Sequence, residues 1–230
     1  SNTHMASNLN KKLDRARNGP GLFEITLGVV LSITLGVLLA VLHLIFKPVE
    51  VVAKPPEAAE IGKVYFVEGA TNANKARQWQ RKRQMLADGA SADVVFSEEE
   101  LNAWMATATP KAPQGAAATT TALVTPEKIN FRIQGGVFQV GVQSKVALLG
   151  LTLPLVVQTR GKFVPGDGGF RFTADEFFIG SLPAHMLPGV VPAIMDRIVN
   201  AQELPEDLKT TWSKLKLVAV EDNSLHLSLP

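Results

Sequence analysis

One long apolar stretch, residues 25–46, is the strongest feature of the hydropathy pattern along the chain. It contains no charged residue and no proline, and its polar members are Thr26, Ser32, Thr34 and His43. A helix over this stretch is about 33 Å long, slightly more than the roughly 30 Å of hydrocarbon in a bilayer. Buried helices of globular cores are seldom apolar on all sides at this length. The pattern therefore predicts a transmembrane anchor at residues 21–47, preceded by a short basic tail at residues 1–20.

The charges on either side of the anchor favour one orientation. Four basic residues precede the span and three follow it, namely Lys11, Lys12, Arg15, Arg17 and then Lys47, Lys54, Lys63. This balance predicts a cytoplasmic N-terminus and an extracytoplasmic main domain. Cleavage as a signal peptide near Val51-Val52-Ala53 is the alternative, but a secretory apolar region usually runs about 7–15 residues. An uncleaved signal-anchor, single-pass, is the favoured interpretation.

Small residues recur every fourth position on one side of the predicted anchor: Gly28, Ser32, Gly36 and Ala40. Helical spacing places them on one face, where the backbone of another helix could approach closely. The alternative is that glycine and serine are simply common in membrane helices. The face predicts a partner helix, from a second copy or from another subunit.

The segment after the anchor changes to short elements. Residues 48–62 hold three prolines and predict a semi-extended linker, and residues 63–67 predict a short strand. Residues 71–88 predict a helix that ends near Gly89, with Ala76, Trp79 and Leu86 on one face. This helix is strongly basic, so it either faces solvent, the favoured interpretation, or lies against anionic head groups.

A second helix is predicted to begin at Ser97. Ser97 and Glu100 have the spacing of a capping box, and Phe96 and Leu101 that of a hydrophobic staple. The three glutamates at 98–100 could instead form a metal or acid–base site, but adjacent helical residues do not face one point. Capping is therefore taken as the full explanation of these carboxylates. Residues 107–125, rich in Ala, Thr and Pro, predict a flexible loop.

The second half of the chain has the alternation typical of strands. Residues 128–133 and 137–148 form a predicted hairpin, with Phe138, Val140 and Val142 on an apolar face and Gln139, Gly141 and Gln143 on a wetter one. Residues 151–163 and 170–179 continue the meander, and Pro154 indicates an edge or a bulge. An apolar helix is predicted from Leu187, a last helix over 205–212, and a closing hairpin over 216–229. The fold class is α+β: a single N-terminal transmembrane helix, then a curved antiparallel sheet wrapped over helices in one domain, residues 63–230.

Composition removes several classes of function. A formal net charge of +2 argues against nucleic acid as a partner, and the absence of cysteine excludes disulfides and thiolate metal sites. No phosphate-binding loop, dinucleotide fingerprint, zinc motif or nucleophile elbow occurs in the sequence. His185 and His226 could meet in space, but isolated histidines are more often structural. No catalytic residue, metal or cofactor is predicted, and the protein is expected not to be an enzyme.

The order of elements resembles that of known bacterial proteins. An anchor, a helix opened by S-E-E-E-L-N-A-W and then long strands looks like membrane-anchored proteins of the YpmS type. The strand end F-F-I-G-S-L-P before an amphipathic helix is similar to LmeA and YceB lipid-binding proteins. The resemblance covers roughly residues 94–229. It implies a tubular lipid-binding-like fold, a place in the bacterial inner (cytoplasmic) membrane and a periplasmic domain, and it offers no catalytic residues.

Two hypotheses of function follow. In the first, the extracytoplasmic domain binds membrane lipid or another hydrophobic ligand in an apolar interior lined or bordered by Phe131, Phe138, Val140, Phe172, Leu187, Val191 and Ile194. The alternative is that these residues simply fill an ordinary hydrophobic core. In the second, the protein is an accessory or scaffold subunit of a larger membrane complex, docked through the Gly28/Ser32/Gly36/Ala40 face.

Overall fold

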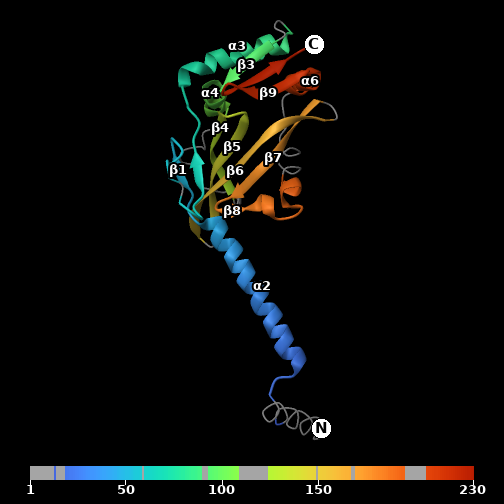
Figure 1. The fold of residues 1–230 in the computed structure, drawn as a ribbon. Helices are drawn as coiled ribbons and strands as arrows, with labels where there is room; N and C mark the ends of the chain where they lie inside the picture. Colours follow the sequence, from blue (N-terminus) through green and yellow to red (C-terminus); the bar gives the residue numbers. More distant parts are fainter. Residues whose placement is uncertain are drawn as a thin grey trace. The chain divides into compact units, whose positions relative to one another are not determined.

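The computed structural model describes residues 13, 19–58, 60–89, 93–108, 124–148, 150–166, 169–194 and 206–230. The chain divides into two units, residues 1–43 and 44–230. The first contains most of helix α2 (Leu22–Phe46), and the second is an α+β domain that includes the last turn of α2 (Figure 1).

No residue of helix α2 is buried, and its side chains from Leu22 to Ala40 are all exposed. Its hydroxyls are satisfied within the helix, since the Oγ1 atoms of Thr26 and Thr34 donate to Leu22 O at 2.9 Å and Val30 O at 2.8 Å. Among the described residues it is the one helix long and apolar enough to cross a membrane. The prediction of one N-terminal helix of this length and hydropathy is confirmed.

The largest sheet of the second unit is an antiparallel meander. It comprises β4 (Val124–Gln134), β5 (Val137–Leu148), β6 (Leu151–Gly166), β7 (Gly169–Ile179) and the short β8 (Leu182–Pro183), hydrogen-bonded in chain order. Gly135 and Gly136 both have positive φ, which suits the tight turn between β4 and β5. Pro154 pairs with Lys145 of β5, whereas β7 pairs with β6 only from Val157 onward. The proline therefore lies where β6 is locally an edge, as predicted.

A second sheet joins strands that are far apart in sequence. Its order is β3 (Asp93–Ser97), β10 (Ser224–Ser228) and β9 (Leu217–Glu221), all antiparallel. The closing hairpin was predicted, and positive φ at Asp222 and Asn223 gives it a tight turn. Its pairing with β3 was not predicted, so the domain has separate antiparallel sheets rather than the single one expected.

The second unit also contains short helices: η1 (Ala73–Lys75), α3 (Ala76–Ala87), α4 (Glu98–Ala108), η2 (Ala184–Met186) and α6 (Glu206–Lys214). The helix predicted at 71–88 is confirmed as η1 plus α3, and Gly89 follows it with positive φ. Most of the loop predicted at 107–125 lies outside the described residues. Of the apolar helix predicted from Leu187, residues 190–194 are helical and the remainder also lies outside them.

The region predicted as a linker contains a strand. β1 (Glu50–Val52) pairs in parallel with β2 (Tyr65–Val67). Lys63 fastens this pair, because its Nζ lies 2.6 Å from the Glu50 carboxylate and 3.6 Å from that of Glu60. The hydrogen bond to Glu50, against a smaller effect of desolvation, raises the pKa of Lys63 above its ordinary value of 10.5.

Candidate functional site: an apolar cavity

Helix α4 is held by the capping box that the sequence predicts. Ser97 N donates to Glu100 Oε2 at 2.9 Å, and Glu100 N donates to Ser97 Oγ at 3.3 Å. The Glu100 carboxylate is almost fully buried and also receives the ammonium of Lys82 at 2.7 Å. Phe96 and Leu101, the predicted staple, are buried in the same cluster. Helix α3 is thereby tied to the beginning of α4.

Capping does not explain Glu98, which corrects the sequence interpretation. Its carboxylate accepts the backbone N–H of Ile133 at 2.7 Å and that of Ala70. Asn102, one turn later, accepts from Phe131 N at 2.7 Å and donates to Phe131 O at 2.8 Å. These two side chains satisfy backbone groups along the free edge of β4, as a neighbouring strand would. Helix α4 is thus fixed against the sheet by two polar side chains.

One face of the meander is covered by the chain segment 65–69. On this covered face, the register aligns Asn130, Gly141 and Gln158 across three strands. Phe66, with no exposed surface, lies against Gly141, where an added Cβ would stand 2.0 Å from the Phe66 ring. The absence of a side chain at Gly141 therefore creates the space that Phe66 fills. The face predicted to be wet is buried.

Amide side chains of the covered face bind the backbone of this segment. Asn130 accepts from Gly69 N at 2.7 Å and donates to Gly69 O at 3.3 Å. Gln139 donates to Val67 O and Gln158 to Tyr65 O, both at 3.2 Å. Because buried polar groups are costly unless they are paired, these bonds specify where the segment lies.

The opposite face of the meander borders an apolar cavity of about 300 Å³. Its walls come from α3, β3, α4, strands β4, β5 and β6 of the meander, α6 with the residue that follows it, and β10. They consist of twelve apolar side chains with Arg83 and Thr211: Trp79, Leu86, Phe96, Leu101, Trp104, Phe131, Phe138, Phe163, Trp212, Leu215, Leu225 and Leu227. We call this side of the sheet the cavity face. A volume of this size is at the lower end of the range for small-molecule sites.

All three tryptophans of the protein line this cavity. Trp79 and Trp104 stack with ring centroids 4.5 Å apart. Trp212 donates its indole N–H to Phe170 O at 2.7 Å, so its polar atom is satisfied while its ring faces the apolar walls. Rigid aromatic walls with few polar atoms suit a hydrophobic ligand.

The structure brings some of the predicted ligand-binding residues together and separates others. Phe131 and Phe138 line the cavity, with ring centroids 5.6 Å apart. Val140 and Phe172 pack against the same core without lining the cavity. Leu187 is exposed and Val191 and Ile194 are half-buried, and none of them belongs to the cavity walls.

The sequence interpretation did not assign Trp79, Trp104, Trp212, Leu225 or Leu227 to the site. One sequence feature could have indicated these residues: every tryptophan lies within a predicted helix. The alternation of Leu225 and Leu227 along the last strand was a second signal. The proposed partner-helix face lies in α2, where Gly28, Ser32, Gly36 and Ala40 leave an open surface, and a Cβ added at Gly28 or Gly36 would meet nothing within 4 Å.

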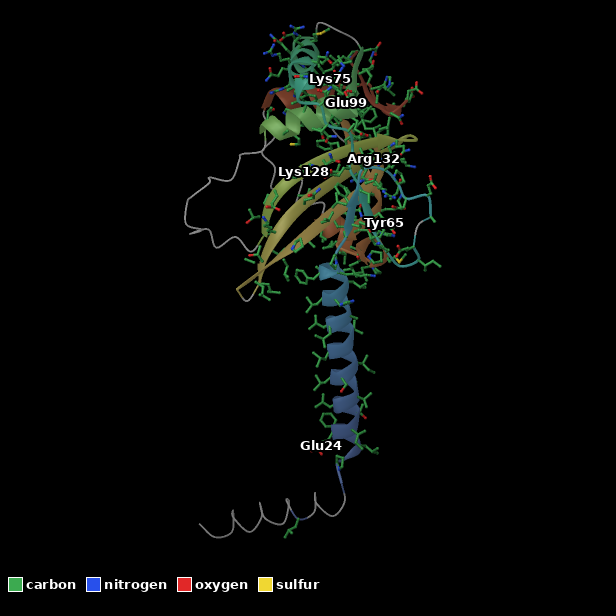
Figure 2. All side chains as sticks on the ribbon, turned by 90° about the vertical axis from the view of Figure 1, so that its left-hand side faces the viewer. Glu24, Tyr65, Lys75, Glu99, Lys128 and Arg132 are labelled. Carbon is green, nitrogen blue, oxygen red and sulfur yellow. The ribbon has the colours of Figure 1, made fainter. Side chains whose placement is uncertain are left out.

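A groove on the other side of the second unit is lined mostly by polar and charged residues. Figure 2 shows Lys128 and Arg132 of this groove on the same side as Tyr65. Several of its charged groups are engaged in structural contacts, since Lys128 pairs with Glu68 at 2.7 Å and Glu98 accepts backbone N–H groups. Within the described parts of the chain, no cluster of three metal-ligating side chains occurs. His185 lies in η2 and His226 in β10, so they belong to different elements.

Comparisons of this chain with family models, with curated proteins and with solved structures give no match. The resemblance to YpmS, LmeA and YceB proteins therefore stays a prediction.

Proposed function

We propose that this is a membrane-anchored, non-enzymatic protein whose domain binds a hydrophobic ligand in the apolar cavity. The observation that carries the proposal is a cavity of about 300 Å³ whose walls are apolar except for Arg83 and Thr211. Apolar cavities of this kind stay dry and accept apolar molecules. Each Å² of apolar ligand surface removed from water contributes about 25 cal/mol.

The size of the cavity limits the ligand. A whole phospholipid with two acyl chains needs more room than about 300 Å³, so the proposed ligand is one acyl chain or a molecule of similar bulk. The anchor keeps the domain beside a supply of such molecules. From the charge balance around α2 we place the N-terminus in the cytoplasm and the domain on the periplasmic side of a bacterial inner membrane.

A variant that fills the cavity tests the proposal. Leu225→Phe enlarges a wall residue, whereas Val218→Ile adds a methylene to a buried core residue that does not line the cavity. The full-length proteins are purified in mild detergent, and the lipid bound to each is quantified by native mass spectrometry. Wild type and Val218→Ile should carry a species that Leu225→Phe lacks. Equal amounts in all three, or no bound species in the wild type, would refute the proposal.

A second candidate function is favoured by the open small-residue face of α2. A docked helix would make this protein an accessory or scaffold subunit of a larger complex. Gly36→Leu should then abolish co-purification of the partner, while Val37→Leu, one position away and on another side of the helix, should retain it. Unchanged co-purification with Gly36→Leu would rule out this mode of docking.

A further inference from the structure

The connection between β5 and β6 is an apolar hairpin tip exposed to the surroundings. Leu148 is 41% exposed and Leu151 is 63% exposed, although they face each other in the register of the hairpin. No charged residue occurs between Lys145 and Arg160. Single exposed leucines are common on protein surfaces, but a paired, uncharged apolar tip is typical of a surface that meets a non-aqueous neighbour.

The last turn of the anchor is packed into the domain close to this hairpin. Ser181 N donates to Leu44 O at 2.9 Å, and Gly180 N donates to Val156 O of β6 at 2.7 Å. A Cβ added at Gly180 would stand 1.9 Å from Ile45 O, so this close approach requires glycine. Strand β6, the turn before β8 and the end of α2 thus form one junction within the second unit.

The tip and this junction lie at the same end of the second unit. Figures 1 and 2 both show the β5–β6 hairpin reaching toward the end at which residues 44–46 enter the domain. Leu151 is five residues from Val156, about 17 Å along an extended strand. A second exposed apolar group, Met186 at 71% and Leu187 at 39%, follows shortly after Ser181. Four exposed apolar residues, Leu148, Leu151, Met186 and Leu187, thus belong to segments that adjoin this junction, whereas others, such as Met85 and Leu217, lie in α3 and β9.

We infer that the β5–β6 tip inserts into the surface of the membrane that α2 crosses. The occupant of this apolar surface is the bilayer, because the anchor holds it within reach and the tip carries no charge for a polar partner. Insertion is shallow: unpaired backbone groups cannot be buried in hydrocarbon, and β6 pairs with β5 alone over residues 151–155. The domain then contacts the membrane at two points, the anchor and the tip.

This inference depends on α2 as a membrane anchor and is independent of the ligand cavity. It also predicts the lipid dependence of the contact. Because the tip is uncharged, insertion should be the same in neutral and in anionic bilayers, whereas a basic surface would bind anionic lipid more strongly.

A site-specific probe tests the contact in the full-length protein. The chain has no cysteine, so Leu151→Cys can carry a single environment-sensitive fluorophore. Gln134→Cys, at the exposed turn on the other end of β5, is the matched control. In phosphatidylcholine vesicles, the probe at position 151 should emit at shorter wavelength and be quenched by nitroxide-labelled lipid. The control probe should do neither, and added phosphatidylglycerol should change nothing.

Adding Leu148→Asp to the position-151 protein should return its probe to solvent-like emission. The same substitution in the position-134 protein checks that the domain stays folded, because that probe should be unaffected. Solvent-like emission from position 151 at the outset would overturn the inference. Shielding of the probe without quenching by lipid would overturn it too, because a protein rather than the bilayer would then cover the tip.

Discussion

The two faces of the five-stranded meander differ in how they are covered. On the covered face, Phe66 fills the space above Gly141, and amide side chains bind the backbone of the covering segment. On the cavity face, large aromatic side chains from several elements meet and leave about 300 Å³ between them. The covering elements differ: an extended segment follows the strands closely on one face, whereas three helices and a second sheet surround the cavity on the other.

In the proposed function, the covered face is structural and the cavity face admits the ligand. Polar pairing on the covered face is specific, so any replacement there should affect stability. On the cavity face, side chains pack around an unfilled volume. Substitutions there should therefore change ligand binding before they change stability. Three predictions follow, in order of the size of the effect expected.

The largest effect should come from Phe66→Ala on the covered face. Phe66 has no exposed surface, and truncating a buried phenylalanine typically costs about 3–5 kcal/mol. Urea titration of the full-length protein in mild detergent, followed by tryptophan fluorescence, would measure the loss. A loss below about 1 kcal/mol would show that the covering segment contributes little.

A double-mutant cycle checks that this loss arises from contact with Gly141. Gly141→Ala alone should destabilise the domain, because its Cβ would stand 2.0 Å from the Phe66 ring, and overpacking typically costs about 1–3 kcal/mol. In a Phe66→Ala background the same substitution should be tolerated. Additive effects would mean that the two residues are not coupled.

An intermediate effect is expected from the buried amides, and two of them form a natural comparison. Asn130 uses both its donor and its acceptor on Gly69, whereas Gln158 Oε1 has no partner among the described residues. Asn130→Leu should therefore cost about 1–3 kcal/mol, since it leaves the Gly69 groups unpaired. Gln158→Met should cost less. The same urea titration measures both, and the reverse order would contradict the assigned roles.

The smallest effect concerns the β1–β2 pair at Lys63. The raised pKa of Lys63 means that its contribution to stability is complete below pH 10.5 and is lost as pH rises through the higher folded value. The amide hydrogen-exchange rates of residues 50–52 should therefore rise with pH more steeply than the intrinsic exchange rates do. This excess should occur only in strongly alkaline solution. Lys63→Gln should remove this excess, whereas Lys54→Gln, in the same segment, should leave it unchanged.

Much of this architecture could be predicted from local patterns. The charge-free run at 25–46 predicted the helix, alternation and glycine turns predicted strands β4 to β7, and S-E-E-E predicted the capping box. Each depends on neighbours in sequence, through periodicity or through the hydrogen bonds of a single turn. Phe131 and Phe138 were placed at the site because alternation assigns them to one face.

What could not be predicted depends on contacts between distant segments. Pairing of β3 with β10 joins residues more than a hundred positions apart, and five residues such as D-V-V-F-S do not specify a partner. Glu98 looked like part of a cap, and only the approach of Ala70 and Ile133 shows its other role. The sequence pattern assigned Gln139 and Gly141 to a solvent-facing side of the strand, because the segment that covers them, residues 65–69, lies about seventy residues earlier in the chain.

Tryptophan quenching tests most directly whether the cavity face admits a hydrophobic ligand. All three tryptophans line the cavity and none lies in the anchor, so lipid around α2 is not detected. Full-length protein in nanodiscs is titrated with a brominated fatty acid, whose bromines quench only at contact range. Saturable quenching that Leu225→Phe abolishes and Val218→Ile retains is the predicted result. Fluorescence that stays constant, or that falls equally in both variants, would show that the cavity holds no such ligand.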